Sequence, residues 1–315
     1  MITKFFTSKR CHILDAKIFA LGFLLITLTL ISSCTKPPLG ACQIVTPAGI
    51  ENMPNCSYIL DQNSIVYDAN GLLKSPKASS VAKKEFTILL FGNYAVSNEK
   101  LAEDDKISHL LEQELFDKLK KRITVINAGI RTAGYRIFSS KYEELIDEYR
   151  PDLVLFLISN TRQIAADYFP PRKINEFCPI KSALDFDKPD NVLKIISSIQ
   201  TQIQNIQEMS LRKNVHALHF WMVPNIRYFD FISEYSECRF LNLLVTKKAI
   251  MFDKIQNAIS KNHLSVINNQ ELLEPTLNLQ KKKFSSRNDL VAEYNKKSAK
   301  IIANQILVHL NYLKK

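Results

Sequence analysis

The stretch Glu85–Lys100, EFTILLFGNYAVSNEK, decides the fold of this chain of 315 residues. Phe86–Phe91 is a short apolar run typical of a buried strand, and it ends at Gly92 in a polar turn that a helical pattern follows. In open α/β sheets, ligands bind beyond the carboxyl ends of the strands, so a strand that ends in a glycine turn is a usual position for functional side chains. Here Asn93 and Tyr94 occupy that position.

Apolar strand-like runs alternate with amphipathic helical patterns over the rest of the chain. In Lys106–Lys120, for example, five apolar residues recur at helical spacing and share one face. Short, fully apolar strands between such helices are typical of a parallel sheet covered on both sides. We therefore expect an α/β fold, a three-layer αβα sandwich of the flavodoxin-like kind with five parallel strands. The predicted strands are Phe86–Phe91, Ile123–Asn127, Leu153–Ile158, His216–Val223 and Leu264–Ile267, and the predicted helices are Lys106–Lys120, Ser139–Tyr149, Asp190–Leu211, Leu241–Lys261 and Asp289–Leu313.

The first 34 residues predict export to the bacterial cell envelope. Four basic residues and one acid precede Ile18–Ile31, a run of 14 apolar or threonine residues that ends in ISSC, with Cys34 last. The run is too short for an ordinary transmembrane helix and has the length of a signal-peptide core. The layout resembles a bacterial lipoprotein signal, which implies lipid on Cys34 and anchoring at the outer membrane or the periplasmic face. A cleaved secretory signal with an incidental cysteine and a signal anchor are the alternatives.

The chain divides by composition into a signal peptide at 1–33, a lipidated, cysteine-containing segment at 34–84 and a main domain at 85–315. Within the middle segment, Asn70-Gly71 favours a tight hairpin turn. Its end, Lys74–Lys84, indicates a flexible tether. We expect the middle segment to hold the main domain away from the membrane.

Four cysteines of the exported chain indicate two disulfides. Loop entropy and closeness in sequence favour Cys42–Cys56 and Cys178–Cys238, although three pairings exist and buried free thiols are an alternative. No CxxC or HxxxH spacing occurs, so we expect no metal site. We expect no cofactor either.

The formal net charge of +11 does not by itself indicate a nucleic-acid-binding protein. The basic residues are scattered, with small clusters at Lys281–Lys283, Lys296–Lys297 and Lys314–Lys315, and aromatic residues do not interleave with them. A solvated basic surface is the favoured interpretation. The alternative is attraction to anionic lipids or glycans of the envelope. The sequence identifies no protein partner.

Glycine is rare, with seven residues in all, so each one is expected where the backbone requires it. Gly92 and Gly129 end two neighbouring predicted strands, and Asn160 follows a third. We therefore expect Gly92–Tyr94, Asn127–Gly129 and Asn160 to meet at one crevice. An asparagine side chain and a free backbone N–H are donors that hold an oxyanion in acyl-transfer enzymes. Tight turning alone is the alternative explanation of the glycines.

At this edge the chain resembles the SGNH (GDSL-type) hydrolases. LLFGNY falls where that family carries Gly-Asp-Ser, INAGIRTAGY resembles its second block, and PDLVLFLISN resembles its third block, which ends in asparagine. EYNKKSAKIIANQI, from Glu293 to Ile306, is similar to the helix that follows the family's Asp-x-x-His. The resemblance covers Glu85 to Leu313 and implies an SGNH-hydrolase-like fold. It also implies these oxyanion or pocket residues: Asn93, Tyr94, Gly129 and Asn160.

The residues of the family's catalytic triad are missing at the expected positions. In the family, a serine attacks an ester, a histidine acts as base and an aspartate orients the histidine. Here Tyr94 stands at the serine position, Asn93 precedes it, and Ala292 or Glu293 stands at the histidine position. A phenol with a pKa of about 10 is a poor nucleophile at neutral pH. None of the six histidines is placed to serve as the base.

We therefore expect a catalytically degenerate SGNH hydrolase-like lipoprotein that binds a ligand or partner, with Tyr94 lining or filling its pocket. The alternative is an esterase or acyltransferase that acts on acylated envelope glycans or lipids with displaced residues. Its nucleophile would be Ser97 and its weak base Glu293 or Asp289, although Ser97 is also typical of a turn or helix cap. A third alternative is a scaffold that works through its basic surface or the proline-rich loop Thr161–Pro189.

Overall fold

Five parallel strands form the central sheet of this protein, seen in a computed structural model. The strands are β5 (Phe86–Gly92), β6 (Ile123–Gly129), β7 (Leu153–Ile158), β8 (His216–Trp221) and β9 (Val266–Asn268). Their order is β6-β5-β7-β8-β9, and all neighbouring pairs are parallel. Counted along the chain, this is the 2-1-3-4-5 order of flavodoxin-like sheets. It confirms the predicted α/β fold.

The structure describes residues 42–60, 63–74, 85–130, 133–158, 189–222, 266–268 and 287–313. Within these ranges, no helix has the length and apolar character that crossing a membrane requires. Several predictions concern residues outside them: the signal peptide at 1–33, Cys34, the tether from residue 75 onward, Asn160, the loop from Thr161, the Cys178–Cys238 pair and the helix Leu241–Lys261.

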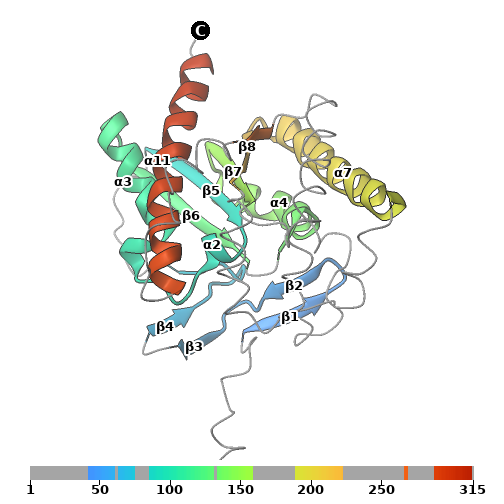
Figure 1. Cartoon of the computed structure of the whole chain (residues 1–315), viewed down its shortest axis with the longest axis horizontal. Coiled ribbons are helices and arrows are strands. Elements are labelled where there is room, and N and C mark those ends of the chain that lie inside the picture. Colours follow the sequence, from blue (N-terminus) through green and yellow to red (C-terminus); the bar gives the residue numbers. More distant parts are fainter. Residues whose placement is uncertain are drawn as a thin grey trace, which may run out of the picture. The chain divides into compact units, whose positions relative to one another are not determined.

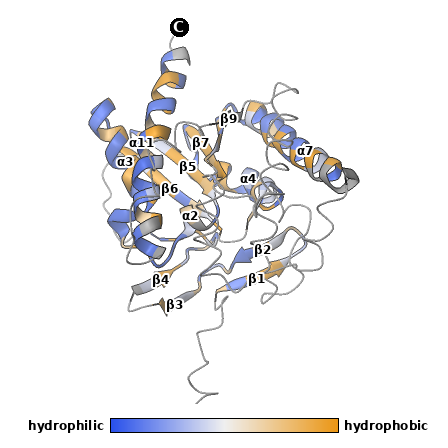
Figure 2. Ribbon diagram, in the orientation of Figure 1, coloured by the Kyte–Doolittle hydropathy of each residue, from blue (hydrophilic) through white to orange (hydrophobic). Residues whose placement is uncertain are grey.

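Two layers of helices cover the sheet, one on each face (Figure 1). The helices are α3 (Ile107–Leu119), α4 (Tyr135–Tyr149), α7 (Pro189–Lys213) and α11 (Arg287–Leu313). Successive residues of β5 point to opposite faces, as in any strand. Ile88 and Leu90 therefore join the core under α3 and α11, whereas Leu89 and Phe91 join the core under α4 and α7. Figure 2 shows the result as hydrophobic strands between helices with hydrophilic outer surfaces.

The predicted elements differ from the observed ones mainly at their ends. The second main helix, α4, begins at Tyr135 rather than at Ser139, with Gly134 in extended conformation as its N-cap. Strand β8 ends at Trp221 rather than at Val223. All six residues of β7 are buried, as the absence of polar residues in its sequence requires.

Two antiparallel hairpins precede the sheet. They comprise β1 (Gln43–Thr46) with β2 (Gly49–Asn52), and β3 (Ser57–Leu60) with β4 (Asn63–Val66). A disulfide joins Cys42 to Cys56, as predicted. The Asn70-Gly71 turn is also present, closed by a bridge between Tyr67 and Leu73. Residues Cys42–Lys315 form one compact unit.

Candidate functional site

The carboxyl ends of β5, β6 and β7 lie side by side. Gly92 is opposite Gly129 of β6 and Leu157 of β7 in the register of the sheet. The structure thus brings together two of the three segments that the sequence placed at one crevice. The third, around Asn160, lies outside the described residues.

A short helix, α2 (Tyr94–Ser97), lies directly on this edge. A Cβ atom added to Gly129 would lie 2.5 Å from the backbone nitrogen of Ser97 and 2.8 Å from its Cα. A Cβ added to Gly92 would collide with the side chain of Val96. Close packing of α2 therefore explains both glycines, which favours a structural reason for them.

Both peptide groups of Gly129 are already hydrogen-bonded. Its N–H donates to Oδ1 of Asn127 at 2.9 Å, and its carbonyl accepts from Nδ2 of Asn52 at 3.2 Å. Nδ2 of Asn127 donates to the carbonyl of Val96 at 2.8 Å and so ties β6 to α2. To hold an oxyanion, the N–H of Gly129 would first have to leave Asn127.

Asn93 has a structural partner as well. It is 2% exposed, and its Oδ1 accepts a hydrogen bond from the N–H of Ala95 at 3.4 Å. Its carbonyl accepts from the N–H groups of Val96 and Ser97. Asn93 is therefore the N-cap of α2, a role for which asparagine is among the best residues. Tyr94 is the first residue of α2.

Ser97, the nearest hydroxyl to the family's serine position, is not activated in this structure. The residue is 2% exposed, and its buried Oγ has no hydrogen-bond partner among the residues that the structure describes. An activated serine needs a base within hydrogen-bond reach. The predicted weak bases do not meet this need: Asp289 is exposed in the first turn of α11, and Glu293 pairs with Lys297 at 3.4 Å.

The amino-terminal part of α11 does reach the carboxyl edge of the sheet. The hydroxyl of Tyr294 donates to the carbonyl of Met222, the residue after β8, at 2.6 Å. Nδ2 of Asn295 donates to the carbonyl of Asp105 at 3.0 Å. The start of α11 therefore lies beside the carboxyl edge, and among the described residues no hydrogen bond joins its carboxylates to Ser97.

The described histidines lie apart from Ser97. His109 contacts Asp104 on the surface side of α3, with 3.3 Å between Nε2 and Oδ1. The rings of His216 and His309 lie edge to face, with 5.6 Å between their centroids. His219 is buried against Phe156. Within the described part of the chain, no histidine side chain hydrogen-bonds Ser97.

His219 belongs to a buried polar network that the sequence did not predict. Nε1 of Trp221 donates to the hydroxyl oxygen of Tyr135 at 3.1 Å, and that hydroxyl lies 3.2 Å from Nδ1 of His219. Tyr135 thus joins the side chains of Trp221 and His219 in the interior. Burial lowers the pKa of His219 to about 3. The sequence signal for this network was that His219 and Trp221, two residues apart, lie on the same face of a strand.

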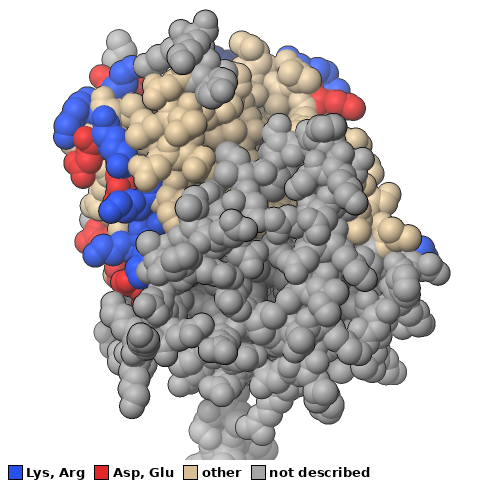
Figure 3. Space-filling view, turned by 45° about the horizontal axis from the view of Figure 1, so that its top comes forward, with Lys and Arg blue, Asp and Glu red and all other residues tan. Residues whose placement is uncertain are grey.

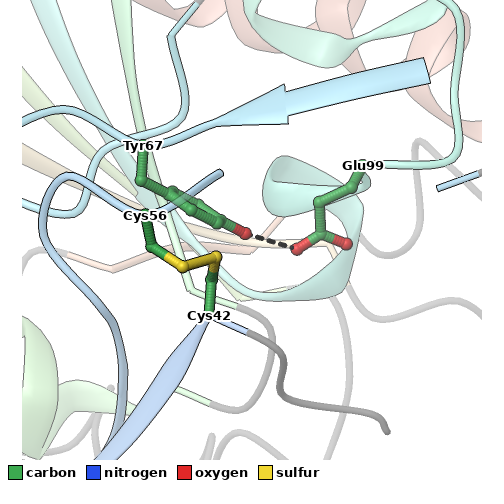
Figure 4. Close-up of a disulfide and its surroundings, with 4 residues drawn as sticks. All are labelled: Cys42, Cys56, Tyr67 and Glu99. Carbon is green, nitrogen blue, oxygen red and sulfur yellow. Dashed lines mark hydrogen bonds between the residues drawn. A yellow bond between two sulfur atoms is a disulfide. The ribbon is translucent and has the colours of Figure 1, made fainter. Parts of the chain in front are cut away.

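The amino-terminal hairpins also contact this edge. Asn52 makes one such contact, through Gly129. In a second, the hydroxyl of Tyr67 donates to Oε1 of Glu99, just beyond α2, at 3.0 Å (Figure 4). Both residues are buried. Burial and the neighbouring Glu99 carboxylate raise the pKa of Tyr67 far above its usual range. The segment predicted as a spacer therefore supplies neighbours of the candidate site.

Charged side chains of both signs share the face seen in Figure 3, where basic and acidic groups lie next to one another at its edge. Helix α3 itself carries charges of both signs, with Glu112, Glu114, Asp117 and Lys118. Among the described residues, no three histidine, cysteine or acidic side chains are grouped as metal ligands.

The sheet order and the helices on both faces define an α/β protein with a flavodoxin-like sheet. Solved structures similar to the chain include esterase EstA from Pseudoalteromonas sp., at 14% identity over 71% of this chain and 98% of that one, with a TM-score of 0.41. A lipase/acylhydrolase from Enterococcus faecalis matches at 14% identity over 70% and 96%, also with a TM-score of 0.41. An acetylxylan esterase from Geobacillus stearothermophilus, a catalytic mutant, matches at 11% identity over 70% and 94%, with the same TM-score.

These likenesses are too distant to transfer an activity or a residue's role to this chain. No protein-family profile matches the sequence, and no curated protein matches it. The function must therefore be argued from the residues at the carboxyl edge.

Proposed function

We propose that this protein is a catalytically degenerate SGNH hydrolase-like lipoprotein that binds a ligand or partner at the bacterial cell envelope. The observation that carries the proposal is the state of Ser97. Within the described part of the chain its buried hydroxyl has no hydrogen-bond partner. The sequence resemblance puts Tyr94, the first residue of α2, at the family's nucleophile position. Ester hydrolysis needs a nucleophile and a base within hydrogen-bond reach.

The residues that surround this edge support a binding role. Asn93 caps α2, and Gly129 donates to Asn127, so two of the positions that resemble oxyanion donors maintain the backbone. The fold retains the carboxyl edge of the sheet, which is the usual ligand position in an open α/β fold. The class of ligand that fits the resemblance is an acylated glycan or lipid of the envelope.

The amino-terminal sequence supports the anchor. A basic segment, the apolar run Ile18–Ile31 and ISSC ending at Cys34 follow the order of a lipoprotein signal. Lipid on Cys34 would hold the protein at the membrane without a spanning helix. Metabolic labelling with an alkyne-tagged palmitate tests this part: we expect incorporation in the wild-type chain and none in Cys34→Ala.

Catalysis is tested on the full-length protein purified in detergent. We expect no labelling by a fluorophosphonate probe and no turnover of short-chain nitrophenyl esters, with a cooperative unfolding transition showing that the protein is folded. A catalytically active SGNH esterase assayed in the same detergent is the positive control. Labelling that disappears in Ser97→Ala would overturn the proposal.

That result would favour the second candidate, an esterase or acyltransferase with displaced residues. The observation in its favour is the contact of Tyr294 with Met222, which places the start of α11 at the carboxyl edge. Movement of α2 would then have to expose Ser97 to Glu293 or Asp289. Loss of activity in Glu293→Gln, with Lys297→Met unaffected, would identify the base.

A further inference from the structure

The amino-terminal hairpins form a cover over the carboxyl edge of the sheet. The cover consists of residues 42–60 and 63–74, and Figure 1 shows its strands on the side of the sheet where α2 lies. Nδ2 of Asn52 donates both to the carbonyl of Gly129, at the end of β6, and to the carbonyl of Gly71, at 3.2 and 3.0 Å. Asn52 is 2% exposed, so this contact is closed to water.

A second contact holds the cover to the segment after α2. The hydroxyl of Tyr67 and Oε1 of Glu99 are 3.0 Å apart in a buried position (Figure 4). A buried carboxylate is costly unless hydrogen-bond donors surround it, so Glu99 gains from the donor that Tyr67 provides. The two contacts together place the cover on both β6 and α2.

The cover has a hydrophobic core of its own. Cys42, Ile65, Tyr67 and Leu73 form one buried cluster, whereas Leu72 of the cover belongs to the core under α4 and α7. Its contacts with α4 include polar ones: Lys141 pairs with Glu51 at 2.9 Å. Further polar contacts with α4 include Arg136 donating to the carbonyl of Pro47, Tyr149 donating to Asp68 and Asn70 donating to Glu148.

The disulfide stabilises both contacts. Asn52 lies inside the loop that the Cys42–Cys56 bond closes, with a sequence separation of 14. The N–H of Tyr67 donates to the carbonyl of Cys56 at 2.9 Å, so Tyr67 is held beside the same bond. Opening the bond would free the loop that carries Asn52 and loosen the strand pairing that positions Tyr67.

We propose that the Cys42–Cys56 disulfide is a redox-sensitive lock on this cover. The intact bond holds Asn52 on Gly129 and Tyr67 on Glu99, and reduction releases the cover and exposes the carboxyl edge. The inference rests on the proposed function, because exposure of this edge matters only if the edge binds a ligand.

The reductant is a dithiol, which supplies two electrons and two protons. One of its thiolates attacks Sγ of Cys56, the half-buried partner, and Cys42 leaves as a thiolate that takes up a proton. The second thiol of the reductant then displaces Cys56 from the mixed disulfide. The reductant ends as a disulfide and both cysteines end as thiols.

Amide hydrogen exchange of the full-length protein tests the lock without any ligand. We expect amides of residues 95–99 and 129–130 to exchange at least ten-fold faster in Cys42→Ser/Cys56→Ser than in the oxidised wild type, with β7 unchanged. Dithiothreitol should produce the same change in the wild type. Cys178→Ser/Cys238→Ser should still respond to dithiothreitol, which excludes the other two cysteines as the cause.

Two outcomes would overturn the inference. If residues 95–99 and 129–130 exchanged at the same rate in the double variant as in the oxidised wild type, the bond would only join the hairpins. If β7 also exchanged faster in the variant, the cover would be part of the folding core. Tyr67→Phe is a second test that leaves the disulfide intact, with a smaller increase expected at residues 95–99. Because exchange reads the cover itself, failure to find a ligand would count against the proposed function and not against the lock.

Discussion

The backbone nitrogen of Ser97 lies in the space that a side chain on Gly129 would fill. An added Cβ would approach that nitrogen to 2.5 Å, closer than real Cβ atoms come to other heavy atoms. The relationship joins α2 to the end of β6 and leaves no room between them. The glycine is required by packing, whatever the edge binds.

Gly129→Ala should therefore be strongly destabilising. The atoms that the new methyl group meets belong to the backbone of Val96 and Ser97, which cannot turn away as a side chain can. We expect the free energy of unfolding to fall by about 2 kcal/mol or more, measured by urea denaturation. Ser197→Ala, on the exposed face of α7, is the control and should change little. Full stability of Gly129→Ala would contradict the close contact.

Ser97→Ala should have the opposite effect. Because its buried Oγ has no hydrogen-bond partner in the described ranges, removing the oxygen relieves an unsatisfied polar group. We expect the free energy of unfolding to stay unchanged or to rise by up to about 1 kcal/mol in the same urea measurement. A clear loss of stability would show that the hydroxyl has a partner. That result would strengthen the hydrolase alternative.

The sheet was predictable because its signals are local and periodic. Short apolar runs such as Leu153–Ile158 can only be strands covered on both faces, and the alternation with helices requires parallel pairing. Parallel strands share one carboxyl edge, which is why Gly92 and Gly129 could be placed together before the structure was known. The Cys42–Cys56 bond followed from closeness in sequence.

The contacts of the site were less predictable because they join side chains far apart in the sequence. Asn52 and Gly129 are 77 residues apart, and Tyr135 and Trp221 are 86 apart. No periodicity marks such pairs. One local signal was available: in Asn127-Ala128-Gly129 the asparagine side chain can bond the N–H two residues on, which occupies the predicted oxyanion donor.

Tyr67→Phe should destabilise the protein by about 1–3 kcal/mol in thermal or urea unfolding. The change removes one donor to the buried Glu99 carboxylate and leaves the ring in place. Tyr142→Phe is a matched control, because its hydroxyl bonds the uncharged Ser210 on the other face of the sheet. We expect the control to be the milder of the two. If Tyr142→Phe lost as much stability as Tyr67→Phe or more, the contact with the Glu99 carboxylate would stabilise the fold no more than an uncharged hydrogen bond does.

The buried network of His219 predicts how stability depends on pH. Its Nδ1 lies 3.2 Å from the hydroxyl of Tyr135, and its ring stacks on Phe156 with 4.6 Å between centroids. The folded pKa of about 3 lies below the value of about 6.5 expected in the unfolded chain. Between these values the unfolded chain binds the proton and the folded one does not, so stability falls as pH drops from about 6.5 toward 3.

His219→Phe should reduce this acid sensitivity. As pH drops from about 6.5 to about 3, the histidine lowers the free energy of unfolding of the wild type by on the order of 4 kcal/mol. The variant lacks this loss. Its stability at pH 7 should be lower, because the hydroxyl of Tyr135 loses its hydrogen bond with His219. Urea unfolding at pH 7, 6, 5 and 4 gives both quantities, and His216→Gln, an exposed histidine of the same strand, is the control. An identical slope in His219→Phe and wild type would mean that His219 is protonated in the folded protein.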